Sequence, residues 1–424
     1  MSTTAEAKAL LRQGRVAEAE QLFDQILQGS PNNIEALNAE ALASLRRADS
    51  RRSVELLDRA VALQPSDALS HYHLGRARSV AGDLSGALQS YATAVRLLPD
   101  FHVARLHYAE TLDRAGDLER APIHYLRALQ DAQQQGHWLD PASTPRGLQP
   151  IVTRAVLLVH ERRRAMCAQL MEPLQTKFGA AALERVNEAV RIHIREAAPN
   201  FPDPRQQPTF FYVPGLPAAP YLDRQLFSWI EAVEASTAAI RAELQRLLPS
   251  AEGRERVFGS AELESVNLRG NAGPPSWNGY YFYRYGIRRE DNCQACPATT
   301  AALAATPLCH IRHHAPEVLY SVFTAGTHLL PHRGVTNSRL VAHLPLLIPA
   351  DCALRVGGEL HAWQEGRIVV FDDTYEHEAW NRSSEIRVVL IFDIWNPHLS
   401  EAEQAAISLL VAAMGDFREL VDRG

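Results

Sequence analysis

The sequence predicts a multidomain α + β chain: an N-terminal array of helical repeats, a helical connector, and a C-terminal domain built as a β-barrel or a double-sheet jelly roll. Three observations predict this class. Prolines recur every 34 residues near the N-terminus, four prolines fall within ten residues near the middle, and short runs of β-branched and aromatic residues dominate from Tyr280 onward. We expect domains at residues 1–135, 136–208 and 209–424.

A 34-residue repeat organises the first domain. Pro31, Pro65 and Pro99 mark its period, and large and small apolar positions recur in the same register. Small residues let paired helices approach, large residues fill the groove between them, and each proline ends a second helix. The pattern resembles four tetratricopeptide repeats, an α-solenoid whose concave surface takes a protein or peptide partner. It departs from that family at Glu40-Ala41, in place of Leu-Gly, and at Gln133, in place of a closing proline.

The connector, residues 136–208, has the pattern of two helices followed by a linker. Apolar residues at helical spacing run from about Gln149 to Ala198. The segment from Pro199 to Pro208 holds four prolines, so we expect a semi-rigid linker there. It is the clearest domain boundary that the sequence offers.

The last domain, residues 209–424, is expected to have a helix at Phe227–Leu248 and then to change to strands. About eight short strands with no helices between them are typical of a barrel or a double-sheet jelly roll. Ser400 and Glu403 have the spacing of a capping box, which predicts a closing helix. The expected strands are Tyr280–Tyr285, Leu319–Thr324, Arg339–Ile348, Ala353–Val356, Arg367–Phe371, Glu376–Trp380, Ile386–Ile394 and one near Leu360.

Composition and charge exclude several classes of function. The chain has 424 residues, 46% of them hydrophobic and 22% charged, and a formal net charge of −6, which is typical of a globular protein and argues against nucleic acid as a partner. No apolar run approaches the roughly 20 residues that a membrane span needs, so we expect no stable membrane insertion. The N-terminus lacks a signal-peptide pattern, and the five cysteines suit a reducing compartment. We therefore expect a cytoplasmic protein.

Two histidines and an arginine point to a mononuclear iron site. His332 stands at an expected strand end, His377 lies 45 residues later on another strand, and Arg387 follows ten residues beyond. Imidazole suits Fe(II). A buried arginine holds a dicarboxylate through two parallel charge-assisted hydrogen bonds. The spacing therefore outlines a non-heme iron enzyme with an anionic cosubstrate.

The same region resembles the aspartyl/asparaginyl β-hydroxylase family of 2-oxoglutarate oxygenases. The matching motifs are Gly-Thr-His-x-x-Pro-His-x-Gly-x-Thr-Asn-x-Arg-Leu, from Gly326, and Phe-Asp-Asp-x-x-x-His-Glu-x-Trp-Asn, from Phe371, followed by an arginine. The likeness covers about Tyr212 to Pro397. It implies a double-stranded β-helix, a jelly roll of the cupin type, which uses Fe(II), 2-oxoglutarate and molecular oxygen.

The resemblance also implies a role for each matched residue. His332 and His377 would ligate the metal. Ser321 and Arg387 would bind the distal carboxylate of 2-oxoglutarate, and His343 would contact the carboxylate nearest the metal. The cofactor site is therefore expected to combine residues from several strands.

Four further positions bear on catalysis and substrate. Asp373 would be the catalytic acceptor that orients a metal-bound water. Most iron oxygenases carry Asp or Glu where this chain has Gly334, and this family replaces that carboxylate with water, which leaves a position that chloride could fill. Arg339 matches the family and is the expected substrate contact. Aspartyl-directed members have a basic residue where this chain has Val341, which puts an aspartyl substrate in doubt.

The expected reaction is hydroxylation of the β-carbon of an aspartyl, asparaginyl or related residue in a protein or peptide that the repeats recruit. The alternatives are a non-catalytic repeat scaffold with a degenerate jelly roll, and a hydroxylase or halogenase of a small molecule or lipid.

Local alternatives also remain open. His328 lies on the strand face of His332 by parity and is a rival ligand. If the strands of His377 and Arg387 pair as a hairpin, the two side chains share a face only across a loop with an odd number of residues.

A second metal cluster is also conceivable from the sequence. Cys293 and Cys296, followed by Cys309 and His310, superficially have zinc-ligand spacing, although a second Cys-x-x-Cys pair is missing. Free thiols and surface histidines are the simpler interpretation.

Overall fold

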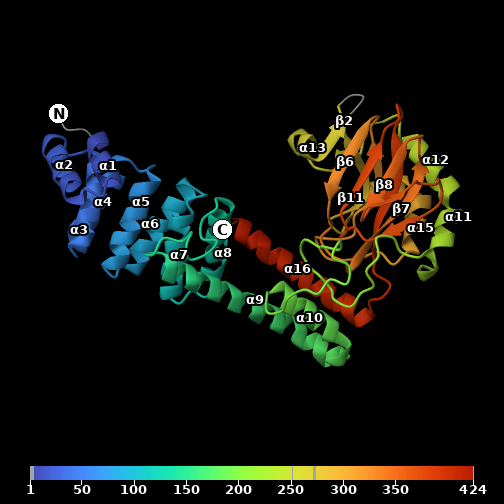
Figure 1. The fold of residues 1–424 in the computed structure, drawn as a ribbon, viewed down its shortest axis with the longest axis horizontal. Coiled ribbons are helices and arrows are strands. Elements are labelled where there is room, and N and C mark those ends of the chain that lie inside the picture. Colours follow the sequence, from blue (N-terminus) through green and yellow to red (C-terminus); the bar gives the residue numbers. More distant parts are fainter. Residues whose placement is uncertain (1–3, 251, 271–273, 424) are drawn as a thin grey trace. The chain divides into compact units, whose positions relative to one another are not determined.

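The computed structural model describes residues 4–250, 252–270 and 274–423, which form two compact units. One unit takes the chain up to residue 164 together with the residues from 418 onward, and the other takes residues 165–417. The first unit is helical and the second is rich in β-strands (Figure 1).

The first unit begins with a stack of helical hairpins (Figure 1). Consecutive helices pack on one another in the order of the sequence, and prolines follow α2, α4 and α6, as the 34-residue period predicts. The helices are α1 (Thr4–Arg12), α2 (Val16–Gly29), α3 (Ile34–Arg46), α4 (Ser50–Leu63), α5 (Ala68–Val80), α6 (Leu84–Leu97), α7 (His102–Arg114) and α8 (Ala121–Gln134).

Close helix contacts explain the small residues of the repeat. A Cβ added at Gly75 in α5 would lie 2.6 Å from Cδ1 of Tyr91 in α6, so glycine at this position allows the two helices to pack on the tyrosine ring. Helices α3 to α6 each begin with a side-chain cap that accepts a hydrogen bond from the backbone N–H three residues on. The capping residues are Asn33, Asp49, Asp67 and Asp83.

The second unit carries two antiparallel β-sheets. The larger has the strand order β1-β3-β5-β12-β7-β10 with β4 beside β3, and the smaller has the order β2-β6-β11-β8-β9. The strands are β1 (Arg254–Arg256), β2 (Leu268–Gly270), β3 (Trp277–Arg284), β4 (Ile287–Arg288), β5 (Val318–Phe323), β6 (Thr327–His332), β7 (Arg339–Leu347), β8 (Cys352–Val356), β9 (Glu359–His361), β10 (Val369–Phe371), β11 (His377–Asn381) and β12 (Arg387–Trp395).

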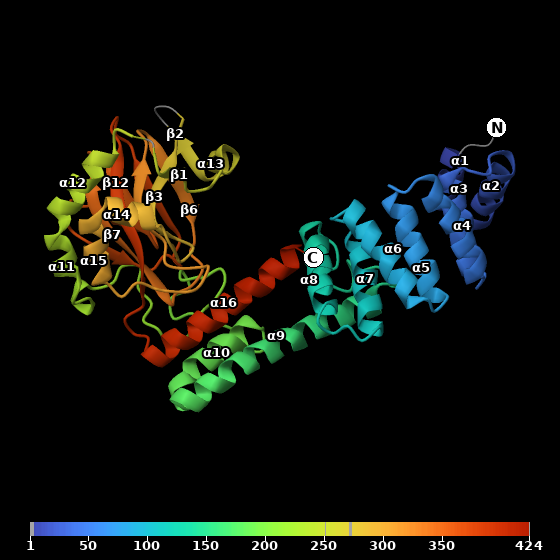
Figure 2. The same ribbon diagram turned by 180° about the vertical axis from the view of Figure 1, so that it is seen from behind.

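The larger sheet lies between a helical layer and the smaller sheet. Its outer face packs on α11 (Ile230–Ala235), α12 (Thr237–Leu247), α14 (Glu290–Ala295) and α15 (Pro297–Ala304), with Leu303 and Leu390 in the shared core (Figure 2). The inner face contributes Phe371 and Val389 to a second core, which it shares with Val356 of the smaller sheet. Alternate residues of each central strand therefore point to different cores. The predicted cofactor residues Ser321, His343 and Arg387 fall at positions that face the layer between the two sheets.

A third core joins helical segments of this unit. It contains residues from the later part of α9 (Gln149–Phe178), from α10 (Glu184–His193) and from α16 (Glu401–Arg423). The predicted capping box at the start of α16 is confirmed, because the Ser400 N–H donates to Glu403 Oε2 at 2.8 Å and the Glu403 N–H donates to Ser400 Oγ at 3.3 Å.

The proline-rich segment and the residues after it lie against the β-sheets. The side chain of Gln206, which is 1% exposed, donates a hydrogen bond to Asp372 at 2.6 Å. Further on, the Phe211 N–H donates to the Val335 carbonyl at 2.9 Å. These contacts fix the loop that follows β6 and the turn that precedes β11, which flank the two strand ends that carry His332 and His377.

A strand overlaps each of the predicted ones, yet the expectation of no helices between the strands is wrong. Helices α14 and α15 stand between β4 and β5, and α15, which has Pro297 in its first turn, buries Ala302 and Leu303 under the larger sheet. Strands β11 and β12 do not form a hairpin. Strand β11 pairs with β6 and β8, whereas β12 pairs with β5 and β7 in the other sheet. The parity condition for His377 and Arg387 therefore does not apply.

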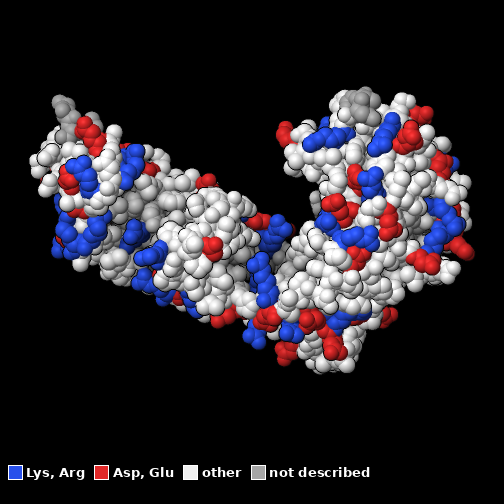
Figure 3. All heavy atoms as spheres, in the orientation of Figure 1, with Lys and Arg blue, Asp and Glu red and all other residues white. Residues whose placement is uncertain are grey.

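Surface charge is mixed in both units. Figure 3 shows basic and acidic side chains interspersed on the visible face of each. Within the described ranges, no helix has the length and hydropathy that crossing a membrane requires.

Candidate active site

His332 and His377 lie side by side in the smaller sheet. They end β6 and begin β11, they are register partners, and their ring centroids are 4.0 Å apart. Nδ1 of His332 lies 2.9 Å from the Leu330 carbonyl oxygen, and Nδ1 of His377 lies 3.0 Å from that of Tyr375. A carbonyl only accepts hydrogen bonds, so each Nδ1 carries the proton and each Nε2 keeps its lone pair. This is the tautomer in which histidine binds a metal.

Burial keeps both rings neutral. It lowers the pKa of His332, and burial together with the neighbouring His332 lowers the pKa of His377 to about 3. Both imidazoles are therefore neutral at neutral pH, as metal ligation requires.

The parity expectation for His328 is wrong, because the pairing of β6 with β11 contains a β-bulge. His377 opposes His332 and Ala379 opposes Leu329, so three steps along β6 match two steps along β11. The extra residue in β6 means that His332 and His328, although four residues apart, oppose β11 residues on different faces of the sheet, namely His377 and Trp380. His328 instead lies 2.7 Å from Glu378 and against the ring of Trp380. His332 is the histidine that the structure places beside His377.

A carboxylate fills the space beside Gly334. A Cβ added to Gly334 would lie 2.1 Å from Cγ of Asp373 and 2.2 and 2.3 Å from its two carboxyl oxygens. The Gly334 N–H also donates to the Asp373 carbonyl at 2.6 Å. Any side chain at residue 334, two positions after His332, would displace the Asp373 carboxylate, and glycine avoids this clash. Burial raises the pKa of Asp373 to about 7, although Arg339 opposes this.

Arg387 is a buried cation without a carboxylate partner among the described side chains. It is 1% exposed, and its guanidinium lies 4.3 Å from the ring centroid of Phe323 and 4.2 Å from that of Trp363. Its Nη1 donates to Ser321 Oγ at 3.2 Å, and its Nε has no partner. Burial lowers the pKa of Arg387 to about 9. A buried cation with unused donors is suited to an anion.

Ser321 has one proton left for that anion. Its Oγ accepts from Arg387 and also from Trp277 Nε1 at 2.9 Å, and these two bonds use both lone pairs. The described part of the chain offers no acceptor for its hydroxyl proton. Ser321 and Arg387 together therefore present several N–H and O–H donors beside the rings of Phe323 and Trp363.

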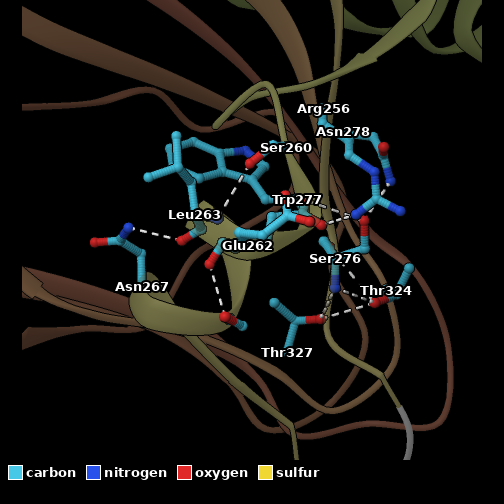
Figure 4. A network of polar contacts seen from close by, with 12 residues as sticks. Arg256, Ser260, Glu262, Leu263, Asn267, Ser276, Trp277, Asn278, Thr324 and Thr327 are labelled. Carbon is cyan, nitrogen blue, oxygen red and sulfur yellow. Dashed lines mark hydrogen bonds and ion pairs between the residues drawn. The ribbon is translucent and has the colours of Figure 1, made fainter. Parts of the chain in front are cut away.

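A polar network fixes Trp277. Its ring meets those of Phe258 and Phe323 edge to face, and its backbone N–H donates to the buried carboxylate of Glu264 at 3.1 Å. Glu264 belongs to α13 (Ala261–Asn267), which Ser260 caps (Figure 4). Figure 4 also shows the Ser276 backbone N–H bonded to the hydroxyls of Thr324, which follows β5, and of Thr327, which begins β6.

Aromatic rings connect the histidine pair with the arginine. Phe371 lies 5.7 Å from His377 and 4.9 Å from His343, measured between ring centroids, and His343 lies 5.9 Å from Trp363. His343 is 5% exposed, its Nδ1 has no partner, and burial holds its pKa well below the usual value. His343 is therefore a neutral group between the two ends of the site.

Arg339, the expected substrate contact, is held by two carboxylates. Its Nη1 donates to Asp393 and its Nη2 donates to Asp373 at 3.2 Å. All three side chains are largely buried. Contacts of these side chains thus link five of the predicted site residues, namely Ser321, His332, His343, His377 and Arg387, in the layer between the two sheets. The structure also couples the other two, Arg339 and Asp373.

The alternative zinc cluster does not assemble. Cys293, Cys296 and Cys309 are free and buried. Burial raises the pKa of the Cys296 thiol to about 12 and that of Cys309 well above its usual value, whereas a zinc ligand is a thiolate. Among the residues that the structure describes, no group of three or more His, Cys, Asp or Glu side chains is placed to hold a metal ion.

Three contributors to the site were missed in the sequence: Trp277, Phe323 and Trp363. Each lies outside the two motifs, and an aromatic residue in a strand is most often a core residue. Trp277 begins the aromatic run of β3, which was the one available signal.

The fold and the site define a helical-repeat protein with a two-sheet β domain that carries a half-buried, neutral histidine pair. The family model described as Aspartyl/Asparaginyl beta-hydroxylase matches residues 234–397. A tetratricopeptide repeat model matches residues 4–34, 38–100 and 75–136.

Relatives support the same assignment. The mouse aspartate beta-hydroxylase domain-containing protein 2 is 32% identical over 60% of this chain and 72% of its own length. The Rhizobium tropici ornithine lipid ester-linked acyl 2-hydroxylase is 34% identical over 43% of this chain and 63% of its own. The mouse aspartyl/asparaginyl beta-hydroxylase is 27% identical over 84% of this chain and 43% of its own. The chain belongs to the aspartyl/asparaginyl β-hydroxylase family, and it spans less than two thirds of the last two relatives.

Proposed function

We propose that the chain is an Fe(II)- and 2-oxoglutarate-dependent hydroxylase whose catalytic domain is a double-stranded β-helix. The alternation of strands between two facing sheets supports this fold, since β5, β7, β10 and β12 lie in one sheet and β6, β8, β9 and β11 in the other. Family membership supports hydroxylation as the reaction. The observation that carries the proposal is the pair of neutral histidines, each with its Nδ1 against a backbone carbonyl, which ring contacts link to an arginine without a carboxylate partner among the described residues.

The residues fit the metal and the cosubstrate. His332 and His377 would hold Fe(II), and Asp373 supplies a nearby carboxylate oxygen, Oδ1, that is buried without a partner. Arg387 and Ser321 would bind the distal carboxylate of 2-oxoglutarate through charge-assisted hydrogen bonds, and His343 would meet the other end. Bound Fe(II), with 2-oxoglutarate and oxygen, would supply the oxidation that places a hydroxyl on a substrate C–H bond.

The chain's own residues orient the ligands and exclude water. Phe323 and Trp363 cover the two faces of the Arg387 guanidinium, so its hydrogen bonds form at low dielectric, where they are strong. Asp373 would accept a hydrogen bond from a water held at this site and so fix the direction of that water. Gly334 supplies no ligand of its own, so a water or a halide would complete the ligand set that the two histidines begin.

The substrate we propose is the β-carbon of an aspartyl, asparaginyl or related residue in a protein or peptide bound on the repeat array. The names of two relatives and the match to the repeat model support it. We place the activity in the cytoplasm, which the five free cysteines support. A second candidate substrate is a lipid acyl chain, because one relative acts on an acyl chain and the buried Val341 offers no charge for an aspartyl carboxylate.

Succinate release tests this function. The purified full chain, with Fe(II), 2-oxoglutarate and a cell extract as substrate source, should release succinate, and the His332→Ala His377→Ala variant should not. Equal release by both proteins, or none by either, would leave the non-catalytic scaffold as the better account.

Mass spectrometry of the products then separates the substrates. A gain of one oxygen on an aspartyl or asparaginyl residue supports the proposal. The same gain on a fatty acyl chain moves the assignment to lipids, and a chlorinated product in chloride buffer makes the enzyme a halogenase.

A further inference from the structure

Arg339 has no charge to spare for a substrate. It pairs with the carboxylates of Asp373 and Asp393, whose side chains are 8% and 3% exposed. One positive charge therefore faces two negative charges inside the domain, and a third carboxylate from a substrate would meet net repulsion. This distinguishes Arg339 from Arg387, which has no carboxylate beside it among the described residues.

Asp393 anchors this arginine to the framework of the larger sheet. It lies in β12, and its Oδ2 accepts from the Glu317 N–H at 2.9 Å as well as from Arg339. Its backbone N–H donates to the Glu317 carbonyl at 3.1 Å, and its carbonyl accepts from the Cys309 N–H at 3.0 Å. Three segments thus fix Asp393, and Asp393 fixes one arm of the guanidinium.

The other arm of the guanidinium sets the place of Asp373. Arg339 Nη2 donates the one side-chain hydrogen bond that the Asp373 carboxylate receives in the described part of the chain, on Oδ2, and Oδ1 is buried without a partner. The same carboxylate fills the space beside Gly334, two residues after His332. Its position therefore depends on Arg339 on one side and on the absence of a side chain at residue 334 on the other.

We propose that Arg339 is a positioning residue, which holds the Asp373 carboxylate beside the histidine pair through the brace Asp393–Arg339–Asp373, and that it does not bind substrate. The carboxylate that most two-histidine sites carry two residues after the first histidine is here delivered from a different segment, and Arg339 directs it. This inference rests on the proposed metal site. It predicts that Arg339 and Asp373 act as one unit on metal affinity.

A double-mutant cycle on metal binding tests the brace. Mn(II) would be titrated into the full chain without 2-oxoglutarate, for the wild type, Asp373→Asn, Arg339→Gln and the double variant. Loss of a group that supports a metal ligand shell lowers affinity by about 10- to 100-fold. We expect both single variants to fall in that range and the double variant to bind no more weakly than the weaker single variant.

Two controls separate positioning from folding. Arg339→Lys keeps one cationic donor and should recover part of the lost affinity. Arg185 forms a two-fold hydrogen-bonded pair with the buried Glu403 elsewhere in the same unit, at 2.7 Å for each bond. Arg185→Gln should leave Mn(II) affinity within about twofold, since it removes a comparable ion pair away from the site.

Each outcome decides the question. If the fold losses of Mn(II) affinity in the two single variants multiply in the double variant, the brace is wrong. It is also wrong if Arg339→Gln binds Mn(II) as the wild type does and only its KM for the protein substrate rises. If the wild type does not bind Mn(II), the proposed function and the brace both fail. A wild type that binds, with multiplying losses, overturns the brace alone.

Discussion

Arg387 and Arg339 are buried arginines in one sheet, on the paired strands β12 and β7, in opposite electrostatic surroundings. Arg387 lies between two aromatic rings, with a serine hydroxyl as its hydrogen-bond acceptor, and burial lowers its pKa to about 9. Arg339 lies between two carboxylates, and these raise its pKa against the effect of burial.

The difference separates a binding group from a supporting group. A buried cation that lacks a counter-ion costs free energy until an anion arrives, so Arg387 stores the capacity to bind a ligand. A buried cation that already has two counter-ions stabilises the fold and fixes the direction of each carboxylate. Burial alone would not tell these two roles apart.

The largest expected effect is the loss of folding stability when Arg339, the partner of Asp373 and Asp393, is replaced. Arg339→Met leaves Asp373 and Asp393 buried without their partner, which should lower the free energy of unfolding by about 3–5 kcal/mol. Urea denaturation of the purified protein at pH 7 would measure it. A loss below about 1 kcal/mol would show that the carboxylates do not depend on Arg339.

Glu317 should make the folded protein less stable as pH rises, whereas a carboxylate whose pKa is lowered in the folded state makes it more stable. Burial raises the pKa of Glu317 to about 7, so the folded state holds a proton that the unfolded chain releases above about 4.5, and stability falls as pH rises through this window. Glu317→Gln keeps the oxygen that accepts from the Tyr285 N–H and should raise the unfolding free energy at pH 8 by about 1–3 kcal/mol. The variant and the wild type should match near pH 4, and an equal effect at both pH values would contradict the account.

Replacing Arg387 should not destabilise the ligand-free protein. Methionine keeps an apolar chain between Phe323 and Trp363 and removes the uncompensated charge. We expect an unfolding free energy that is unchanged or higher by up to about 2 kcal/mol, measured by urea denaturation without 2-oxoglutarate. A loss as large as that of Arg339→Met would mean that Arg387 has a structural role.

The smallest expected effect concerns Trp277. Trp277→Phe keeps an aromatic ring but removes the N–H that orients Ser321, so affinity for 2-oxoglutarate should fall about 3- to 10-fold in isothermal titration. Trp229→Phe, in the core on the helical side of the same sheet, is the matched control and should leave affinity unchanged. Equal losses in both variants would assign the effect to packing.

Local patterns predicted much of the fold. The period of 34 residues located the repeat helices, and the capping box at Ser400 located α16, because both depend on residues close in sequence. The bulge in β6 and the separation of β11 from β12 depend on strand pairing across the chain. Alternation within one strand carries no information about either, so the parity expectation for His328 failed and the parity condition for Arg387 did not apply.

The site residues divide in the same way. Motif spacing predicted His332, His377 and Arg387 as site residues, and the structure places the two histidines together and Arg387 against aromatic residues of the core between the sheets. The partners that give each residue its character come from other segments: Trp277 for Ser321, Asp393 for Arg339, and the space beside Gly334 for Asp373. Such relations exist only after the chain has folded, and a single sequence does not reveal them.

Ligand-dependent stability tests the central claim most directly. The unfolding midpoint of the wild type and of Arg387→Met would be compared with Mn(II) alone and with Mn(II) plus 2-oxoglutarate, without oxygen. Binding to the folded state raises stability in proportion to the logarithm of ligand over Kd, so we expect 2-oxoglutarate to raise the wild-type midpoint and to leave that of Arg387→Met unchanged. An equal rise in both proteins, or no rise in the wild type, would contradict the assignment of Arg387 as the anion-binding group.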